Sequence, residues 1–230
     1  MYFQHAEDIW RDFPELVPMT LFAEGITPDV DVRERIAPFN ATATERLAIS
    51  SEGEFPEIQA WRRAFSRMGL KPTQYRCASE SLLRRFRKDG ALPEIHPLID
   101  LCNAISLAYA IPIAVFDLAR VRDFIEVRRA TGEEVYLTLG GETEHPDPNE
   151  VIFADGAGNA HARRWTNRQS GASAIRESTS SILIVAEAMH SAAADDVPRL
   201  LATISAELES VWPVSPRSAI LAPSASRFEF

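Results

Sequence analysis

One short segment in the last third of the chain gathers the residue types best suited to binding and chemistry. Residues 163–170 are Arg-Arg-Trp-Thr-Asn-Arg-Gln-Ser, so three arginines and two amides surround a tryptophan. Arginine suits bidentate phosphate contacts, and an exposed tryptophan stacks on a base or a sugar. Alternatively, the segment is a strand in which Trp165 packs inward and the arginines point outward. The residue types support both interpretations equally.

Two further sets of polar residues lie beside apolar segments. Asp100, Asn103 and Ser106 recur every three residues along a segment with a helical pattern, so they form one polar stripe. The stripe fits an exposed helix face or the hydrogen-bonding edge of a pocket, since Asn and Ser are poor helix formers. Glu142 follows two glycines at a predicted turn, where a carboxylate either orients an amino group or a water, or lies solvated at a hairpin tip.

Several common chemistries have no counterpart in the sequence. There is no glycine-rich phosphate loop, no G-x-S-x-G elbow and no H-E-x-x-H helix. The five histidines are scattered, and Cys77 and Cys102 lie far apart with no metal-ligand spacing around them. We therefore expect neither a nucleotide-driven enzyme nor a zinc hydrolase, and we expect no cofactor and no metal.

The charge of the chain gives no general basic signature for nucleic acid. The formal net charge is −9, from 33 acidic and 24 basic residues, and DNA is not an expected partner. The basic residues are nevertheless clustered, and all except Lys71 and Lys88 are arginine. Composition alone favours ordinary solvated helix faces for these clusters. The chain shows no signal peptide and no apolar run near the ~20 residues of a membrane span, so we expect a cytoplasmic protein without a membrane partner.

The order of the predicted elements indicates an α+β fold with a mixed or antiparallel sheet flanked by helices. Apolar periodicity and capping residues predict helices at 33–51, 55–69, 79–90, 97–108 and 195–211. Strands are predicted at 26–32, 113–117, 124–130, 135–139, 151–154, 159–165 and 182–186. We expect an N-terminal lobe over residues 1–52, the main domain over 53–212 and a C-terminal tail over 213–230.

Several of these segments, in this order, resemble the B3/B4 editing domain of the bacterial phenylalanyl-tRNA synthetase β subunit. Residues 96–106 are similar to its R-P-[IL]-N-N-V-V-D-I-T-N helix, and 111–117 to its Q-P-L-H-A-F-D segment. Residues 125–130 and 150–155 resemble its I-x-V-R-x-A and L-V-I-A-D strands. Residues 76–85 and 163–169 resemble freestanding B3/4-domain proteins more closely still.

The resemblance implies an α+β fold with a cleft, which in the synthetase hydrolyses tyrosine wrongly attached to phenylalanine tRNA. The chain lacks the ATP-binding motifs of a synthetase, so it is not expected to aminoacylate by itself. It also differs from the family pattern at two places. Ala114 stands where the synthetase has a histidine beside its cleft, and residues 166–171 stand where it has a glycine-rich segment ending in glutamate.

The resemblance implies trans-editing, the hydrolysis of a mischarged aminoacyl-tRNA ester, with the acceptor end of tRNA as partner. An aminoacyl ester is already reactive, so its hydrolysis needs a positioned water and oxyanion donors rather than a strong nucleophile. The candidate catalytic residues are Asn103, Glu142, Arg168 and Gln169; the candidate substrate-binding residues are Glu80, Asp100, Ser106, Arg164, Trp165 and Asn167. Glu80 or Glu142 would bind the α-amino group. Two alternatives remain: a non-catalytic module that binds tRNA or a free amino acid, and a hydrolase of small esters or amides.

Overall fold

Two eight-residue strands at the centre of the molecule organise the fold. In the computed structural model, which describes residues 1–230, β2 (Val17–Glu24) and β10 (Ser181–Ala188) pair antiparallel along their whole length. With β3 (Ile113–Asp117) and β11 (Arg217–Ile220) they form a four-stranded sheet in the order β11-β2-β10-β3. Because strand side chains alternate between faces, β10 contributes to two different hydrophobic cores.

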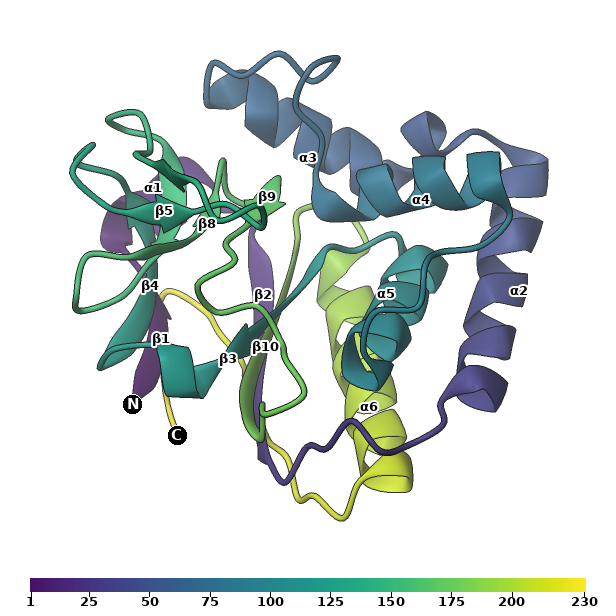
Figure 1. Cartoon of the computed structure of the whole chain (residues 1–230). Coiled ribbons are helices and arrows are strands. Elements are labelled where there is room, and N and C mark those ends of the chain that lie inside the picture. Colours follow the sequence, from purple (N-terminus) through teal and green to yellow (C-terminus); the bar gives the residue numbers. More distant parts are fainter.

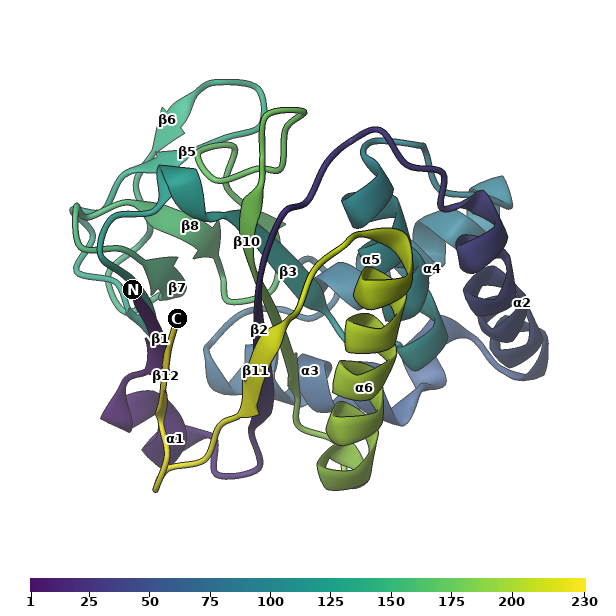
Figure 2. The same ribbon diagram turned by 90° about the horizontal axis from the view of Figure 1, so that it is seen from below.

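The first core lies between this sheet and two helices. Ile182, Ile184 and Ala186 of β10 pack with buried residues of α5 (Pro97–Tyr109) and α6 (Ala193–Val211). Figure 2 shows these two helices on one side of β2, β10 and β3. Burial of this apolar surface removes it from water and supplies much of the driving force for folding.

The second core lies on the opposite face of β10, and it carries the candidate site. Leu183 and Val185 join a cluster that includes Phe153, Trp61 and Trp165. Part of this core comes from a six-stranded sheet of order β12-β1-β4-β7-β8-β9, in which β1 and β4 run parallel and the other neighbours antiparallel. Its strands are β1 (Tyr2–His5), β4 (Phe124–Arg129), β7 (Val151–Ala154), β8 (Ala160–Arg163), β9 (Arg168–Gln169) and β12 (Arg227–Glu229).

The remaining elements complete the layers seen in Figure 1. They are α1 (Glu7–Asp12), α2 (Arg33–Ile49), α3 (Pro56–Arg67), α4 (Ala78–Asp89), the short hairpin strands β5 (Tyr136–Leu137) and β6 (Thr143–Glu144), and the 3-10 turns Glu52–Glu54 and Leu118–Arg120. The predicted α+β class and mixed sheet are confirmed. No helix combines the length and the apolar character needed to cross a membrane.

Residues 26–32 were predicted as a strand, and this prediction was wrong. Gly25 has a φ of 97° and turns the chain away from the end of β2, so the following residues have no strand beside them. Ile26 and Val32 are apolar because they are buried in the core beneath α5 and α6. Apolar content without pairing partners does not make a strand.

Both ends of the chain contribute strands to the sheets. β1 pairs with β4 and with β12, and β11 pairs with β2. The N- and C-termini accordingly lie beside each other in Figure 2. The segment expected as a C-terminal tail is therefore held in the fold by strand pairing, and so is the expected N-terminal lobe.

Candidate functional site

A pocket opens where the start of β3, the turn between β8 and β9, β10 and the first residue of α4 meet. The space within it, including the part of the mouth that is open to solvent, is about 400 Å³. Its wall is mostly apolar, with a few polar groups, which is the usual composition of a small-molecule site. The lining residues are Ala78, Pro112, Ile113, Ala114, Phe153, Ala162, Trp165, Thr166, Asn167, Arg168, Gln169, Val185 and Glu187.

The turn between β8 and β9 has an unusual backbone that shapes the pocket. Arg164 and Trp165 have φ values of 45° and 58°, in the left-handed region that residues other than glycine rarely adopt. Such residues cost on the order of 1–3 kcal/mol each and persist only where neighbours hold them. Here the Arg164 amide donates to Glu150 (2.8 Å) and the Trp165 amide donates to the carbonyl of Val151 (2.7 Å). The turn directs Trp165 inward and leaves residues 166–169 along the pocket.

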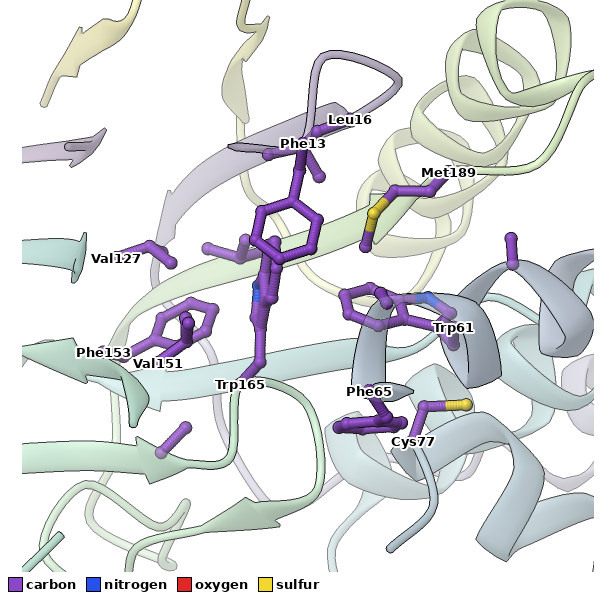
Figure 3. Packing of buried hydrophobic residues seen from close by; sticks show 14 of the residues in the cluster. Phe13, Leu16, Trp61, Phe65, Cys77, Val127, Val151, Phe153, Trp165 and Met189 are labelled. Carbon is purple, nitrogen blue, oxygen red and sulfur yellow. The ribbon is translucent and has the colours of Figure 1, made fainter. Parts of the chain in front are cut away.

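Trp165 is a core residue that closes one side of the pocket. Its side chain is fully buried, and its ring meets Phe13 and Trp61 edge to face, with centroids 4.8 and 5.1 Å apart (Figure 3). No face of the indole is open to a base, so the interpretation in which an exposed Trp165 stacks on a base or a sugar was wrong, and Trp165 packs inward as in the alternative. Its indole N–H donates to both carboxylate oxygens of Glu187, at 3.0 and 2.9 Å.

Glu187 is a charged group at the pocket that was not predicted from the sequence. Its side chain is only 2% exposed, and one carboxylate oxygen lies 2.7 Å from Nε2 of His5. It shares the face of β10 with Val185, which pairs with Ala114 on β3. A carboxylate is costly to bury without partners, so a glutamate within the apolar run Ser181–Ala188 was the available signal.

Three polar side chains along the pocket keep hydrogen-bonding capacity. The hydroxyl oxygen of Thr166 is buried without a partner. The side-chain amide of Asn167 donates to the carbonyl of Arg76 (2.7 Å), and that of Gln169 donates to the carbonyl of Val115. An amide group has two N–H bonds and an oxygen, so each retains one donor and one acceptor. These groups are suited to holding a carbonyl or an ester oxygen.

The match to a known family covers the whole pocket. Residues 60–205 match the B3/4 domain. The chain belongs to the B3/4 domain family. The matched region runs from within α3 into α6, so it supplies every residue that lines the pocket.

Proteins with similar sequences are phenylalanine–tRNA ligase beta subunits. The one from Photorhabdus laumondii is 25% identical over 135 residues, which is 57% of this chain and 17% of the relative. The one from Bradyrhizobium diazoefficiens is 37% identical over 76 residues, 33% of this chain and 9% of the relative. The matches thus span less than a fifth of these relatives.

The fold also resembles a solved structure of the same kind of protein. The crystal structure of an N-terminal fragment of the phenylalanyl-tRNA synthetase beta subunit from Pyrococcus horikoshii aligns with a TM-score of 0.50. The alignment covers 94% of this chain and 50% of that fragment, at 12% sequence identity. At this level of sequence identity, the similarity shows that the two proteins share a fold and no more than that.

Four predicted site residues of this B3/4 domain line the pocket together, and a fifth lies next to them. Trp165, Asn167, Arg168 and Gln169 all line it. Arg168 is 41% exposed and lies 3.1 Å from Glu144, so it sits at the rim as half of an ion pair. Arg164 lies beside the pocket, with its guanidinium 4.8 Å from the centre of the Tyr75 ring.

The other five predicted residues lie elsewhere in the B3/4 domain. Asp100 and Asn103 line a separate hollow between α2 and α5, and Asp100 accepts a hydrogen bond from the Ile95 amide (2.9 Å). Ser106 is buried and donates to the carbonyl of Ile111 (2.6 Å). The expected polar stripe therefore does not edge this pocket.

The two glutamates expected to bind an amino group are also outside the pocket lining. Glu142 is exposed at the turn between β5 and β6, as in the alternative of a solvated hairpin tip. Glu80 is fully buried and holds Arg62 at 2.7 Å and Arg76 at 3.4 Å. Glu187 is the carboxylate that the pocket contains.

Buried ion pairs hold the walls of the site. Arg163 is 4% exposed and contacts Glu150 at 2.9 Å and Glu144 at 2.7 Å. Burial alone would raise the pKa of Glu150, but hydrogen bonds from Arg163 and the Arg164 amide outweigh it and hold that pKa below its usual value. Arg163 is thus a structural residue rather than a phosphate ligand.

The Cys77 thiol is not an activated nucleophile. Burial raises the pKa of this thiol to about 11, which keeps it protonated and a poor nucleophile at neutral pH.

Two other clusters of reactive residue types lie outside the pocket. Ser173 and Asp155 flank His161 at 2.9 and 3.2 Å, but Ser173 and His161 are fully buried, so no substrate reaches the hydroxyl. Potential metal ligands of Glu57, His190 and Asp196 lie within 4.8 Å of one another. Both of these carboxylates already pair with arginines, Glu57 with Arg46 and Asp196 with Arg199, and such pairing opposes binding of a cation.

Proposed function

We propose that this B3/4 domain binds tRNA and hydrolyses the ester of a mischarged aminoacyl-tRNA in the pocket. The observation that carries the proposal is the composition of the pocket. An apolar wall, one buried carboxylate, one hydroxyl without a partner and two side-chain amides with spare hydrogen-bonding capacity match an amino acid esterified to a ribose. The names of the relatives, which are phenylalanine–tRNA ligase beta subunits, support tRNA as the carrier.

Each part of the pocket has a role in this proposal. The amino-acid side chain packs against Ile113, Ala114 and Val185, and the α-ammonium faces the carboxylate of Glu187. A charged hydrogen bond of this kind contributes roughly 1.5–3 kcal/mol. Glu187 therefore takes the role of binding the α-amino group, which was predicted from the sequence for Glu80 or Glu142.

Hydrolysis then needs a positioned water and donors for the developing charge. Water attacks the ester carbonyl, and the resulting oxyanion accepts hydrogen bonds from Thr166 and from the side-chain amide of Asn167 or Gln169. The bond between the carbonyl carbon and the ribose oxygen breaks, the ribose oxygen takes up a proton that the attacking water releases, and free amino acid and tRNA leave. Positioning alone gives large accelerations with an ester that is already reactive.

Binding without hydrolysis is the second candidate, and one observation favours it. No histidine lines the pocket, and Ala114 lies where the family pattern has one. This candidate predicts saturable binding of aminoacyl-tRNA with no release of the amino acid.

A panel of mischarged tRNAs tests the proposal. Purified protein is expected to release the amino acid from at least one tRNA well above the buffer rate, and Glu187→Gln is expected to lower kcat/KM for that substrate about 10- to 100-fold, as the loss of a charged hydrogen bond implies. The amide keeps an oxygen to accept from Trp165. We would measure release of radiolabelled amino acid.

The control is binding of uncharged tRNA, which carries no α-ammonium and is expected to be unchanged in Glu187→Gln. Saturable binding with no release for every pair would replace hydrolysis with the binding-module candidate. Release that is equal in wild type and Glu187→Gln would remove the role given to Glu187.

A further inference from the structure

The positive charge of this acidic chain is concentrated in one stretch. Residues 62–88 contain nine of the 24 basic residues and one of the 33 acidic residues. The rest of the chain holds the other 15 basic and 32 acidic residues, so the stretch is strongly positive within a strongly negative protein. It spans the second half of α3, the loop after it and most of α4. We name this surface the α3–α4 face; its basic residues are Arg62, Arg63, Arg67, Lys71, Arg76, Arg84, Arg85, Arg87 and Lys88.

Two buried carboxylates hold four of these arginines in fixed positions. Glu80, fully buried, holds Arg62 and Arg76, and Glu52, 2% exposed, lies 3.1 and 2.8 Å from Arg84 and Arg87. Each carboxylate neutralises one charge of its pair and leaves one. The four side chains remain 30–46% exposed, so their guanidinium groups are held in place while facing solvent. An array held in this way loses little side-chain entropy on binding a ligand.

Arg67 pairs with Glu15, and the remaining four cations of the face have no carboxylate partner or only a distant one. Arg63 and Lys71 form no ion pair in the structure and are exposed. Arg85 and Lys88 share Asp89 at 3.7 and 3.9 Å, on a hollow lined by charged residues alone. Unpaired arginine and lysine side chains are the groups that bind phosphates.

The α3–α4 face leads directly to the pocket. Ala78, the first residue of α4, lines the pocket, and its amide donates to the carbonyl of Thr166 (2.8 Å). The carbonyl of Arg76 accepts from Asn167, and Arg164 stacks over Tyr75. Figure 1 shows α3 and α4 in the upper part of the molecule, with α3 above β9 and α4 beside it. A polyanion lying on this face would reach the pocket with its end.

We infer that the α3–α4 face binds the phosphate backbone of the tRNA acceptor arm and guides its aminoacylated end into the pocket. This inference rests on the proposed function and adds where the RNA lies. Arginine predominates on the face, and no large apolar side chain within residues 62–88 is strongly exposed. Both features suit a surface that binds RNA phosphates rather than one that inserts apolar side chains into a membrane.

Charge reversal at the two unpaired cations tests the inference. Arg63→Glu/Lys71→Glu is expected to weaken binding of uncharged tRNA at least tenfold. The slope of log Kd against log salt is expected to fall by about 1.4–1.8, since each of the two lost phosphate contacts contributes about 0.7–0.9. Fluorescence anisotropy of labelled tRNA over a range of salt concentrations gives both quantities. The matched control, Arg120→Glu/Arg217→Glu, changes the same charge at exposed residues outside the face and is expected to leave binding within twofold.

Two further measurements separate the possible failures. An aminoacyl ester of adenosine, which has no phosphate, is expected to be hydrolysed equally by wild type and Arg63→Glu/Lys71→Glu. If the wild type hydrolyses no ester but the reversal still abolishes tRNA binding, the proposed hydrolysis fails and the RNA surface stands. Equal tRNA binding by Arg63→Glu/Lys71→Glu and the wild type overturns the inference, as does binding to phosphatidylglycerol vesicles without binding to tRNA.

A second variant serves if Arg63→Glu/Lys71→Glu does not fold. Arg85→Gln/Lys88→Gln is expected to weaken tRNA binding three- to tenfold, and unchanged binding overturns the inference.

Discussion

Replacing Trp165 with alanine is expected to lower the free energy of unfolding by about 4–6 kcal/mol. A buried tryptophan truncated to alanine costs about 3–5 kcal/mol through lost burial and the cavity left behind. Glu187 also loses the indole N–H that donates to both of its oxygens. A buried acceptor that loses a donor adds about 1–3 kcal/mol, part of which relaxation of the cavity offsets.

Chemical denaturation measures this loss, and Trp165→Phe is the matched control. Phenylalanine keeps an aromatic ring between Phe13 and Trp61 but removes the indole N–H. It is expected to cost about 1–3 kcal/mol, the cost of leaving a buried acceptor short of a donor. A loss below about 1 kcal/mol for Trp165→Ala would be far under the usual cost of such a truncation and would contradict its place as a core residue.

Replacing Ala114 with phenylalanine is expected to lower deacylation of aminoacyl-tRNA at least 100-fold. Ala114 lies on β3 opposite Val185, and both line the pocket. A phenyl ring at this position occupies the space proposed for the amino-acid side chain. Because the alanine is partly exposed toward the pocket, the ring fits without overpacking the core, and the free energy of unfolding is expected to change by less than about 1.5 kcal/mol.

The same substitution at Ala91 is the matched control. Ala91 is exposed and lines the separate hollow that contains Asp100 and Asn103. Release of the amino acid from tRNA is expected to persist in Ala91→Phe. The reverse outcome, loss in Ala91→Phe and retention in Ala114→Phe, would move the site to the hollow between α2 and α5 and would restore the sequence-based role of Asn103.

The helices could be predicted from sequence because their signals are local. Pro56 and Pro97 begin α3 and α5, and Gly90, with a φ of 77°, ends α4. The strand prediction at residues 26–32 failed because pairing partners are a tertiary property. The resemblance to B3/4 domains supplied what periodicity does not, namely the position of Ala114 at a cleft.

The candidate site was predicted only where its residues are close in sequence. Asn167, Arg168 and Gln169 follow one turn and reach the pocket together. The inward orientation of the Trp165 side chain depends on the left-handed backbone of Arg164 and Trp165, which no residue type in the sequence predicts. Glu187 lies at the site because β10 pairs with β3. Asn103 lies outside the site because its position on α5 faces α2. Both depend on contacts between distant segments.

The most direct test of the central claim is to locate the aminoacyl end on the protein. A 3′-aminoacylamino-adenosine, whose amide replaces the ester and resists hydrolysis, would be titrated into ¹⁵N-labelled protein and followed by NMR. The amino acid would be the one selected by the deacylation panel. We expect saturable shifts at the backbone amides of Ala78, Ala114, Asn167 and Gln169. Saturable shifts confined to the neighbourhood of Asp100 and Asn103 would contradict the assignment of the pocket.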